Sequence, residues 1–221
     1  MFPDPARRSV KICGITRPGQ AAEIFALGAD AVGINLWPKS KRHMPLEVAM
    51  NSLHDVAARH ALVAVLVNPD DALLDAAWGS GLFQALQLHG DESPGEVERL
   101  MSRGVNVIKA LQVRDAASLP QIGGFACASI LLDAYNPGTY GGGGHAFPWE
   151  LAVRAQEMFP EKSILLSGGL NAGNIRTAVQ QTHPAAVDVA SGVESEPGVK
   201  DLALVARFIA EARAGWDSLT P

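Results

Sequence analysis

The chain has 221 residues, with 18 Lys and Arg against 23 Asp and Glu, so its formal net charge is −5. Hydrophobic residues make up 48% of it, which is enough for a substantial buried core and excludes a disordered chain. The mild acidity and the lack of a basic run predict that neither nucleic acid nor a membrane is a partner.

Targeting and metal signals are weak in this sequence. Residues 1–9 contain no apolar stretch typical of a secretory signal, and no apolar run reaches the roughly 18 residues of a spanning helix. The two cysteines, Cys13 and Cys127, have no metal-ligand spacing, so neither a disulfide framework nor a zinc site is indicated. We therefore expect a reduced, cytoplasmic protein without a metal site.

Short apolar runs alternate eight times with amphipathic stretches. The predicted strands are Val10–Cys13, Ala31–Leu36, Leu62–Val67, Ala85–His89, Val105–Leu111, Ala128–Asp133, Ser163–Ser167 and Ala186–Ala190. The predicted helices are Pro18–Leu27, Leu46–Arg59, Pro69–Trp78, Pro94–Arg103, a weak Ala116–Leu119, Trp149–Met158, Ala172–Gln181 and Asp201–Ala212. Strands this apolar, alternating with helices, indicate a parallel sheet that is covered on both faces.

Eight such units in one chain favour a single-domain (β/α)8 barrel, the TIM barrel, spanning residues 1–221, with loose ends at 1–9 and 215–221. The alternative is a doubly wound open sheet. That fold usually carries fewer strands and, when it binds a dinucleotide, a Gly-x-Gly-x-x-Gly turn after an early strand. Residues 13–17 read Cys-Gly-Ile-Thr-Arg and lack this turn, so we favour the barrel.

In such a barrel, catalytic side chains lie at the carboxyl ends of the strands. Lys11 and Cys13 are two residues apart at the end of the first strand, so they share one face. If that face points inward, the ammonium group would favour the reactive thiolate. The alternative is a small buried cysteine that only packs, and this is how we interpret Cys127.

Polar residues also follow the second, fourth and sixth strands. Residues 37–43 carry three cations, which form either a local anion site or a solvated loop. Gln87 and His89 share a strand face, as ligands or as a hydrogen-bonded structural pair. Asp133 ends an apolar run, which suits a general acid, although a carboxylate that caps a turn is the alternative. The following loop, 134–147, is long enough for a lid and contains four consecutive glycines.

Glycines follow the seventh and eighth strands. Gly168 and Gly169 come after the seventh, and Gly192 after the eighth, with Ser191 at a predicted helix N-cap. Exposed backbone N–H groups at a helix start bind anions, and the loops after strands seven and eight are the usual phosphate site of this barrel. We therefore predict a phosphate site here. Asp188, near the end of the eighth strand, faces inward on one of its two possible orientations.

An ordered set of motifs, each at its own strand end, resembles the phosphoribosylanthranilate isomerase family. The resemblance runs from about Val10 to Asp201, nearly the whole chain. Its motifs are Lys11–Thr16, Ser40-x-Arg42 with Pro45, Gln87–Gly90, Leu132–Asp133, Pro137–Gly142 with Phe147 and Trp149, Ser167–Leu170, and Val187–Glu194 with Lys200–Asp201.

The resemblance implies an Amadori rearrangement of N-(5-phosphoribosyl)anthranilate to the corresponding deoxyribulose phosphate in tryptophan biosynthesis, with no metal and no redox cofactor. It implies that Cys13 is the general base and Asp133 the general acid. By the same resemblance Arg42 holds the anthranilate carboxylate. The substrate-binding set is Lys11, Arg42, Gln87, His89 and Asp188, and the phosphate-binding set is Gly168, Gly169, Ser191 and Gly192.

Two other functions stay open at this point. A histidine-pathway isomerase performs the same chemistry, but that family resembles two half-barrels, with two phosphate sites and an aspartate where Cys13 stands. A catalytically inactive phosphate-binding barrel is the other, and the presence of Cys13, Asp133 and Arg42 argues against it. The expected partner is a small phosphosugar substrate, and the protein is a monomer or a homodimer.

Overall fold

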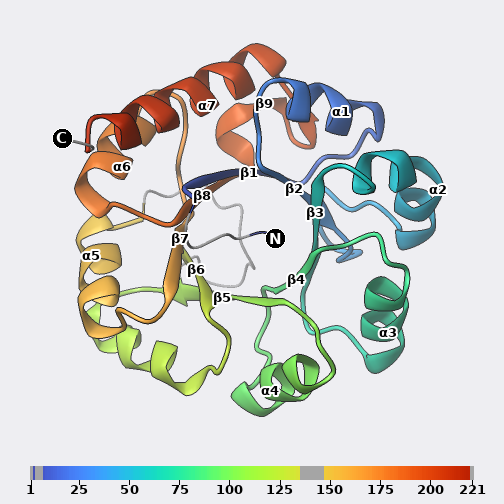
Figure 1. Cartoon of the computed structure of the whole chain (residues 1–221), viewed down its shortest axis with the longest axis horizontal. Coiled ribbons are helices and arrows are strands. Elements are labelled where there is room, and N and C mark those ends of the chain that lie inside the picture. Colours follow the sequence, from blue (N-terminus) through green and yellow to red (C-terminus); the bar gives the residue numbers. More distant parts are fainter. Residues whose placement is uncertain (1, 3–6, 135–146, 220–221) are drawn as a thin grey trace.

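The architecture is a closed barrel of parallel strands. The computed structural model describes residues 2, 7–134 and 147–219. Each main strand pairs with the next in chain order, and β1 also pairs with β8, which closes the ring (Figure 1). The strands are β1 Ser9–Cys13, β2 Ala31–Asn35, β3 Ala61–Leu66, β4 Ala85–Leu88, β5 Val107–Val113, β6 Ser129–Ala134, β7 Ser163–Leu166 and β8 Ala186–Val189. An open sheet has two free edges, so this closure excludes the doubly wound alternative and confirms the predicted barrel.

Helices surround the strands as an outer ring (Figure 1). They are α1 Gly19–Ala26, α2 Leu46–Ala57, α3 Asp71–Gly79, α4 Pro94–Ser102, α5 Trp149–Met158, α6 Ile175–Thr182 and α7 Leu202–Asp217. The weak helix predicted after β5 is a 3-10 helix instead, η1 Ala116–Gly124. Pro120 lies inside it and has no N–H group to donate, which prevents a regular α-helix there.

The start of α4 shows how the sequence sets a helix boundary. Pro94 occupies the first turn, where its missing N–H group costs nothing. The Ser93 hydroxyl accepts from the backbone N–H of Glu96, and the Glu96 carboxylate accepts from the backbone N–H of Ser93. Hydrogen bonds from Ser93 also lower the pKa of Glu96. This reciprocal capping satisfies two N–H groups that a helix start leaves unpaired.

Alternate residues of each strand build two separate cores. One face of each strand packs against the helices in a large apolar cluster, the outer core, which includes Ile12, Ile34 and Val187. The other face points into the barrel and forms, together with Phe2 from the N-terminal segment, an inner core of Ala31, Val63, Ala85, Ile108, Ala110, Leu131, Leu165 and Ala186. Because both faces are buried, the strands have nearly continuous apolar sequences. Polar side chains on the inward face are therefore exceptional.

The ends of the chain, expected to be loose, are packed where the structure describes them. Phe2 is 3% exposed and belongs to the inner core, and its carbonyl accepts from Asn106 Nδ2 at 2.9 Å. Ser9 already belongs to β1. Trp216, near the end of α7, is 3% exposed, and its indole N–H donates to the carbonyl of Pro184 at 3.1 Å. Residues 1, 3–6 and 220–221 lie outside the described part.

Several elements begin later than predicted, among them β5 and α6. Strand β5 starts at Val107, and it extends beyond its predicted end at Leu111 to Val113 because its last residues pair with the end of β6. Helix α6 starts at Ile175, because the side chains of Asn171 and Asn174 hold the preceding residues in a turn.

One element, the short hairpin of β9 (Glu194–Glu196) and β10 (Val199–Lys200), was not predicted. It precedes α7, which continues five residues beyond its predicted end at Ala212, to Asp217. Within the described residues, no helix is both long enough and apolar enough to cross a membrane.

Candidate active site

Three predicted site residues meet inside the barrel between β1 and β8. The Lys11 ammonium group forms an ion pair with Asp188 Oδ1 at 2.8 Å, and the two residues are register partners. Lys11 is fully buried and Asp188 is 4% exposed. Ile12 belongs to the outer core, so Lys11, Cys13 and Asp188 occupy the inward face. This resolves the orientation that the sequence left open.

Cys13 has room inside the barrel because its neighbour on β2 is a glycine. Cys13 pairs in register with Gly33. A Cβ atom at Gly33 would lie 2.8 Å from Cys13 Sγ and 3.1 Å from Lys11 Nζ, so any larger residue would displace these side chains. Gly33 was not among the site residues predicted from the sequence. A glycine inside an otherwise apolar strand is the signal that could have found it.

The environment of Cys13 raises the pKa of its thiol, although Lys11 acts on this pKa in the expected direction. Burial raises this pKa, and the positive charge of Lys11 lowers it by less. For Lys11 the balance is reversed. Burial lowers the pKa of its ammonium group, but Asp188 and Cys13 together raise that pKa by more, so the ammonium form persists. Burial also raises the pKa of Cys127, which precedes β6 at the opposite end of the barrel.

A second polar chain joins β4 to β6. His89 Nε2 lies 3.3 Å from Asp133 Oδ2, and Gln87 Nε2 lies 3.1 Å from His89 Nδ1. An amide nitrogen can only donate, so Nδ1 is the acceptor and the ring proton is on Nε2, facing the carboxylate. Asp133 is 5% exposed, and its Oδ1 accepts from the N–H of Ala134 at 2.9 Å. Gln87 and His89 therefore form one chain of contacts that ends on the carboxyl group of Asp133.

Arg42 is paired with a carboxylate of the chain itself. Its Nε and Nη2 atoms each donate to Glu194 at 2.7 Å, in a bidentate arrangement. Lys200 donates to the same carboxylate at 2.6 Å. The arginine side chain lies against Gly14, where a Cβ atom would be 2.5 Å from Arg42 Cδ. Arg42 thus packs against Gly14, the residue that follows Cys13, and its pairing with Glu194 was not foreseen.

Glu194 and Lys200, the two residues bonded to each other beside Arg42, both come from the β9–β10 hairpin. Burial raises the pKa of Glu194, but the hydrogen bonds from Arg42 and Lys200 together lower it by more. The pKa of Glu194 therefore lies below its ordinary value. For Lys200, burial outweighs Glu194 and lowers the pKa. The bond to Glu194 raises the pKa of Arg42. An opposite-charge pair six residues apart across Pro197–Gly198 is the sequence signal that points to this hairpin.

The predicted phosphate loops lie side by side at the ends of β7 and β8. Gly168 and Gly169 have φ of +85° and +66°, which only glycine adopts without strain. A Cβ atom at Gly192 would lie 1.9 Å from the carbonyl oxygen of Leu170, so the two loops are in backbone contact. A Cβ atom at Gly168 would lie 3.1 Å from Asp133 Oδ1, which places these loops next to the acid.

One detail of the phosphate prediction is wrong. Ser191 is not an N-cap: it is the first residue of the short 3-10 helix η2, Ser191–Val193, which starts after Ala190. The amide of Asn174, by contrast, donates to the carbonyl of Gly169 at 3.0 Å and fixes that loop. The asparagines in the segment after β7 were the sequence signal for this contact.

Two further features concern ligands. The predicted lid glycines, Gly141–Gly144, lie outside the described residues. Within 2, 7–134 and 147–219, no three His, Cys, Asp or Glu side chains gather closely enough to hold a metal ion.

Known proteins resemble this chain over nearly its whole length. A profile of the family N-(5'-phosphoribosyl)anthranilate (PRA) isomerase matches residues 10–211. The N-(5'-phosphoribosyl)anthranilate isomerase of Geobacter metallireducens is 42% identical over 208 residues, 93% of this chain and 98% of that protein.

Two crystal structures give the same result. One, of monomers of the dimeric enzyme from Thermotoga maritima, has a TM-score of 0.80 at 35% identity. The other, of a phosphoribosylanthranilate isomerase bound to reduced 1-(o-carboxyphenylamino)-1-deoxyribulose 5-phosphate, has a TM-score of 0.79 at 36% identity. Each comparison covers 93% of this chain and 98% of the other. The chain therefore belongs to the N-(5'-phosphoribosyl)anthranilate isomerase family.

Proposed function

We propose that this protein isomerises N-(5'-phosphoribosyl)anthranilate to 1-(2-carboxyphenylamino)-1-deoxyribulose 5-phosphate, a step of tryptophan biosynthesis. The observation that carries the proposal is the pair Cys13 and Asp133. Both are buried, at the carboxyl ends of β1 and β6, in a barrel of this family. Those strands are three apart around the closed ring, so their inward side chains can flank one small substrate.

The first step opens the ribose ring. Asp133 gives its proton to the ring oxygen, the bond between that oxygen and C1 breaks, and the anthranilate nitrogen lone pair forms the C1=N bond of an iminium. The carboxylate left behind keeps two donors, His89 Nε2 and the N–H of Ala134. Hydrogen bonds to an ionised group are the stronger kind, so these contacts favour the proton transfer.

The second step needs a base beside the sugar. Cys13, as the thiolate that remains once its own proton has passed to water, takes the proton from C2, the C–H electron pair forms C1=C2, and the C1=N pair returns to nitrogen. The resulting enol tautomerises to the ketone. The pKa of the free thiol is raised by burial, which outweighs the opposing charge of Lys11. The iminium adds a second positive charge only after ring opening, and a nearby cation favours the thiolate at that stage.

The remaining contacts orient the substrate. The guanidinium of Arg42, with Nε and Nη2 on Glu194, has Nη1 for the anthranilate carboxylate. Asp188, paired with Lys11, accepts from the ribose hydroxyls. The backbone N–H groups of Gly169, Ser191 and Gly192 hold the phosphate. The buried Oε1 of Gln87 has no partner among the described residues and is an acceptor for a further sugar hydroxyl.

The proposal is tested by mixing purified protein with N-(5'-phosphoribosyl)anthranilate and following the loss of its anthranilate fluorescence. We expect turnover, with formation of the deoxyribulose phosphate measured by mass and absorbance. A protein that is folded by circular dichroism but leaves the fluorescence unchanged would contradict the proposal and favour an inactive phosphate-binding barrel. The corresponding histidine-pathway substrate is the control, and we expect it to be turned over poorly.

The proposal also covers location and assembly. We place this enzyme in the cytoplasm, acting on a small molecule as a monomer or homodimer. The similar Thermotoga maritima protein is described as dimeric, with monomers obtained from it. Sedimentation equilibrium of the purified chain separates the two assemblies, and a larger oligomer would contradict both.

A further inference from the structure

A buried ion pair outside the substrate site needs an explanation. Lys109 and Glu92 are 1% and 7% exposed, and Lys109 Nζ lies 2.8 Å from Glu92 Oε2. The neighbours of Lys109 on β5, Ile108 and Ala110, belong to the inner core. Since strand residues alternate, the Lys109 side chain lies on the helix-facing side of the barrel wall. Burying two charges carries a large desolvation cost, so packing alone does not account for the pair.

The pair is bonded to the backbone on both sides of His89. Lys109 Nζ donates to the carbonyl of Leu88 at 3.2 Å and to that of Gly90 at 2.8 Å. The Glu92 carboxylate accepts from the N–H of Gly90 at 3.0 and 3.1 Å. The residues directly before and after His89 are thereby fixed from outside the barrel, while its own N–H donates to the carbonyl of Leu66 at 2.8 Å.

Gly90 shows how tightly this segment is held. A Cβ atom there would lie 2.3 Å from Asn68 Oδ1 and 2.7 Å from Glu92 Oε1. Glu92 Oε1 also accepts from the N–H of Asn68 at 2.8 Å. The ends of β3 and β4 are therefore joined through one carboxylate, and there is no space for a side chain at Gly90.

The orientation of His89 matters because of its contact with Asp133. The imidazole reaches Asp133 Oδ2 at 3.3 Å, a distance at which a small displacement removes the bond. We propose that Lys109 and Glu92 are positioning residues, which act through the backbone of His89 to keep its ring against the carboxyl group of Asp133. The inference rests on the proposed function, in which Asp133 is the acid that His89 supports.

The test replaces the pair with apolar residues, Lys109→Met with Glu92→Leu. A buried ion pair can often be replaced in this way without loss of stability, whereas Lys109→Met alone leaves an unpaired buried carboxylate. We expect a folded protein whose kcat falls at least about tenfold, with KM within about twofold, because misplacing a catalytic contact slows the chemical step more than binding. Conversely, an unchanged kcat in the folded double variant would overturn the proposal.

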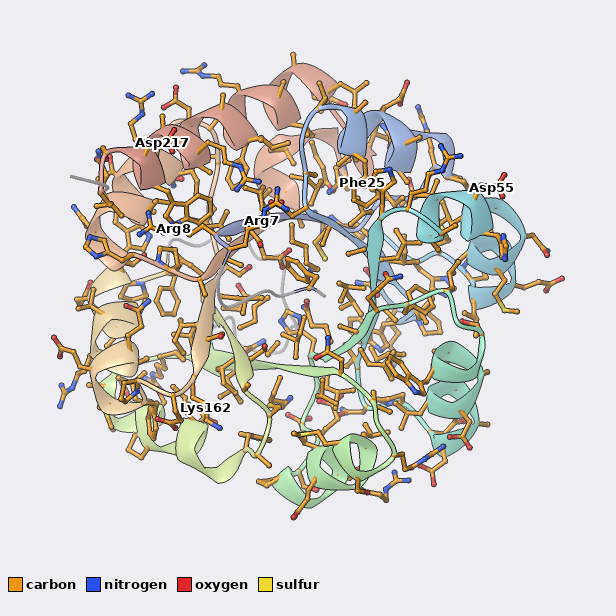
Figure 2. The ribbon with its side chains drawn as sticks, in the orientation of Figure 1. Arg7, Arg8, Phe25, Asp55, Lys162 and Asp217 are labelled. Atoms are coloured by element: carbon orange, nitrogen blue, oxygen red, sulfur yellow. The ribbon has the colours of Figure 1, made fainter. Side chains whose placement is uncertain are left out.

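The matched control is Lys162, which Figure 2 labels. It also donates to two backbone carbonyls, those of Phe125 at 2.7 Å and Cys127 at 3.0 Å, but at the amino-terminal end of β6. We expect Lys162→Met to lower the midpoint of urea unfolding and leave kcat unchanged. If Lys162→Met lowers kcat as much as the pair replacement does, the effect is general loosening and the proposal fails.

Two further measurements isolate the route through His89. In a His89→Ala background we expect the pair replacement to cause no additional fall in kcat. The effects of substitutions that break the same series of contacts do not add. A full additional fall would contradict that route. The 15N imidazole resonances of His89, assigned in the His89→Ala spectrum, should shift in the pair variant and not in Lys162→Met. This readout needs no turnover, so it tests the positioning even if the unmodified protein fails to isomerise the proposed substrate.

Discussion

At the scale of single residues, Cys13 is the proposed base, and yet the pKa of its thiol is raised. Burial alone would disfavour the thiolate, and Lys11 opposes this effect without overcoming it. The structure therefore describes a thiol that is protonated at neutral pH in the free protein. Its deprotonation is coupled to events in the site, when the substrate develops positive charge close to it.

This coupling predicts the reactivity of the free thiol. In a Cys127→Ala variant, we expect the rate of Cys13 alkylation by iodoacetamide to rise about tenfold per pH unit from pH 7 and to keep rising above pH 9.0, because only the thiolate reacts. Quenched samples analysed by mass spectrometry give the rates. A rate that levels off below about pH 8 would contradict the raised pKa. A small cysteine peptide, with its pKa near 8.5, is the control.

Glu194 makes a different prediction, on stability. Its pKa is lowered in the folded protein, so the ionised carboxylate stabilises the fold at pH values above its unfolded pKa, and that contribution is lost as the pH falls through the folded pKa. We expect Glu194→Gln to lower the free energy of unfolding by about 2–4 kcal/mol near pH 6, since it leaves Arg42 and Lys200 without their anion.

Urea unfolding at about pH 6 and about pH 3.5 measures this contribution. The difference between Glu194→Gln and the unmodified protein should shrink at the lower pH, where the native carboxylate is also becoming protonated. An equal difference at both pH values would show that the charge of Glu194 is not responsible. The exposed Glu98→Gln variant controls for the loss of one negative charge.

At the scale of elements, the loops after β7 and β8 act together because their backbones touch. A Cβ atom at Gly192 would meet the carbonyl oxygen of Leu170 at 1.9 Å and Asn171 Cα at 3.0 Å, and backbone cannot turn aside as a side chain can. We expect Gly192→Ala to separate the loops, to raise KM at least about tenfold, and to destabilise the fold by about 1–3 kcal/mol through overpacking.

Steady-state kinetics with inorganic phosphate as a competitive inhibitor provide the measurement, and the inhibition constant should rise together with KM. The control is Gly95→Ala in the first turn of α4, where an added Cβ atom meets nothing within 4 Å. That variant should keep the native KM. If Gly192→Ala also keeps the native KM and inhibition constant, the phosphate is bound elsewhere.

At the scale of the whole molecule, periodicity was sufficient for the fold because both strand faces are buried. Eight apolar runs separated by helices leave few architectures other than a closed barrel, and the strands occur in that order. The same property hides the orientation of each side chain. When both faces are apolar, the sequence does not tell which of Ile12 and Lys11 points inward, and only the closed structure decides it.

Contacts between distant segments could not be predicted from the sequence, for a related reason. The bond of Arg42 to Glu194 joins residues 152 positions apart, and that of Lys11 to Asp188 joins residues 177 apart. Their meeting depends on how the barrel closes, which no local pattern encodes. Most site residues were singled out by their places at strand ends and received their roles from the family resemblance, whereas the carboxylate that holds Arg42 emerged only from the three-dimensional arrangement.

The central claim is that Cys13 and Asp133 act as base and acid from opposite sides of one site. The most direct measurement is kcat for Cys13→Ser, Asp133→Asn and the double variant, each checked for folding by circular dichroism. We predict a fall of at least about 100-fold for each single change, the usual contribution of acid–base catalysis, and a double variant much less impaired than the product of the two. A folded single variant with near-native kcat would contradict the claim for that residue.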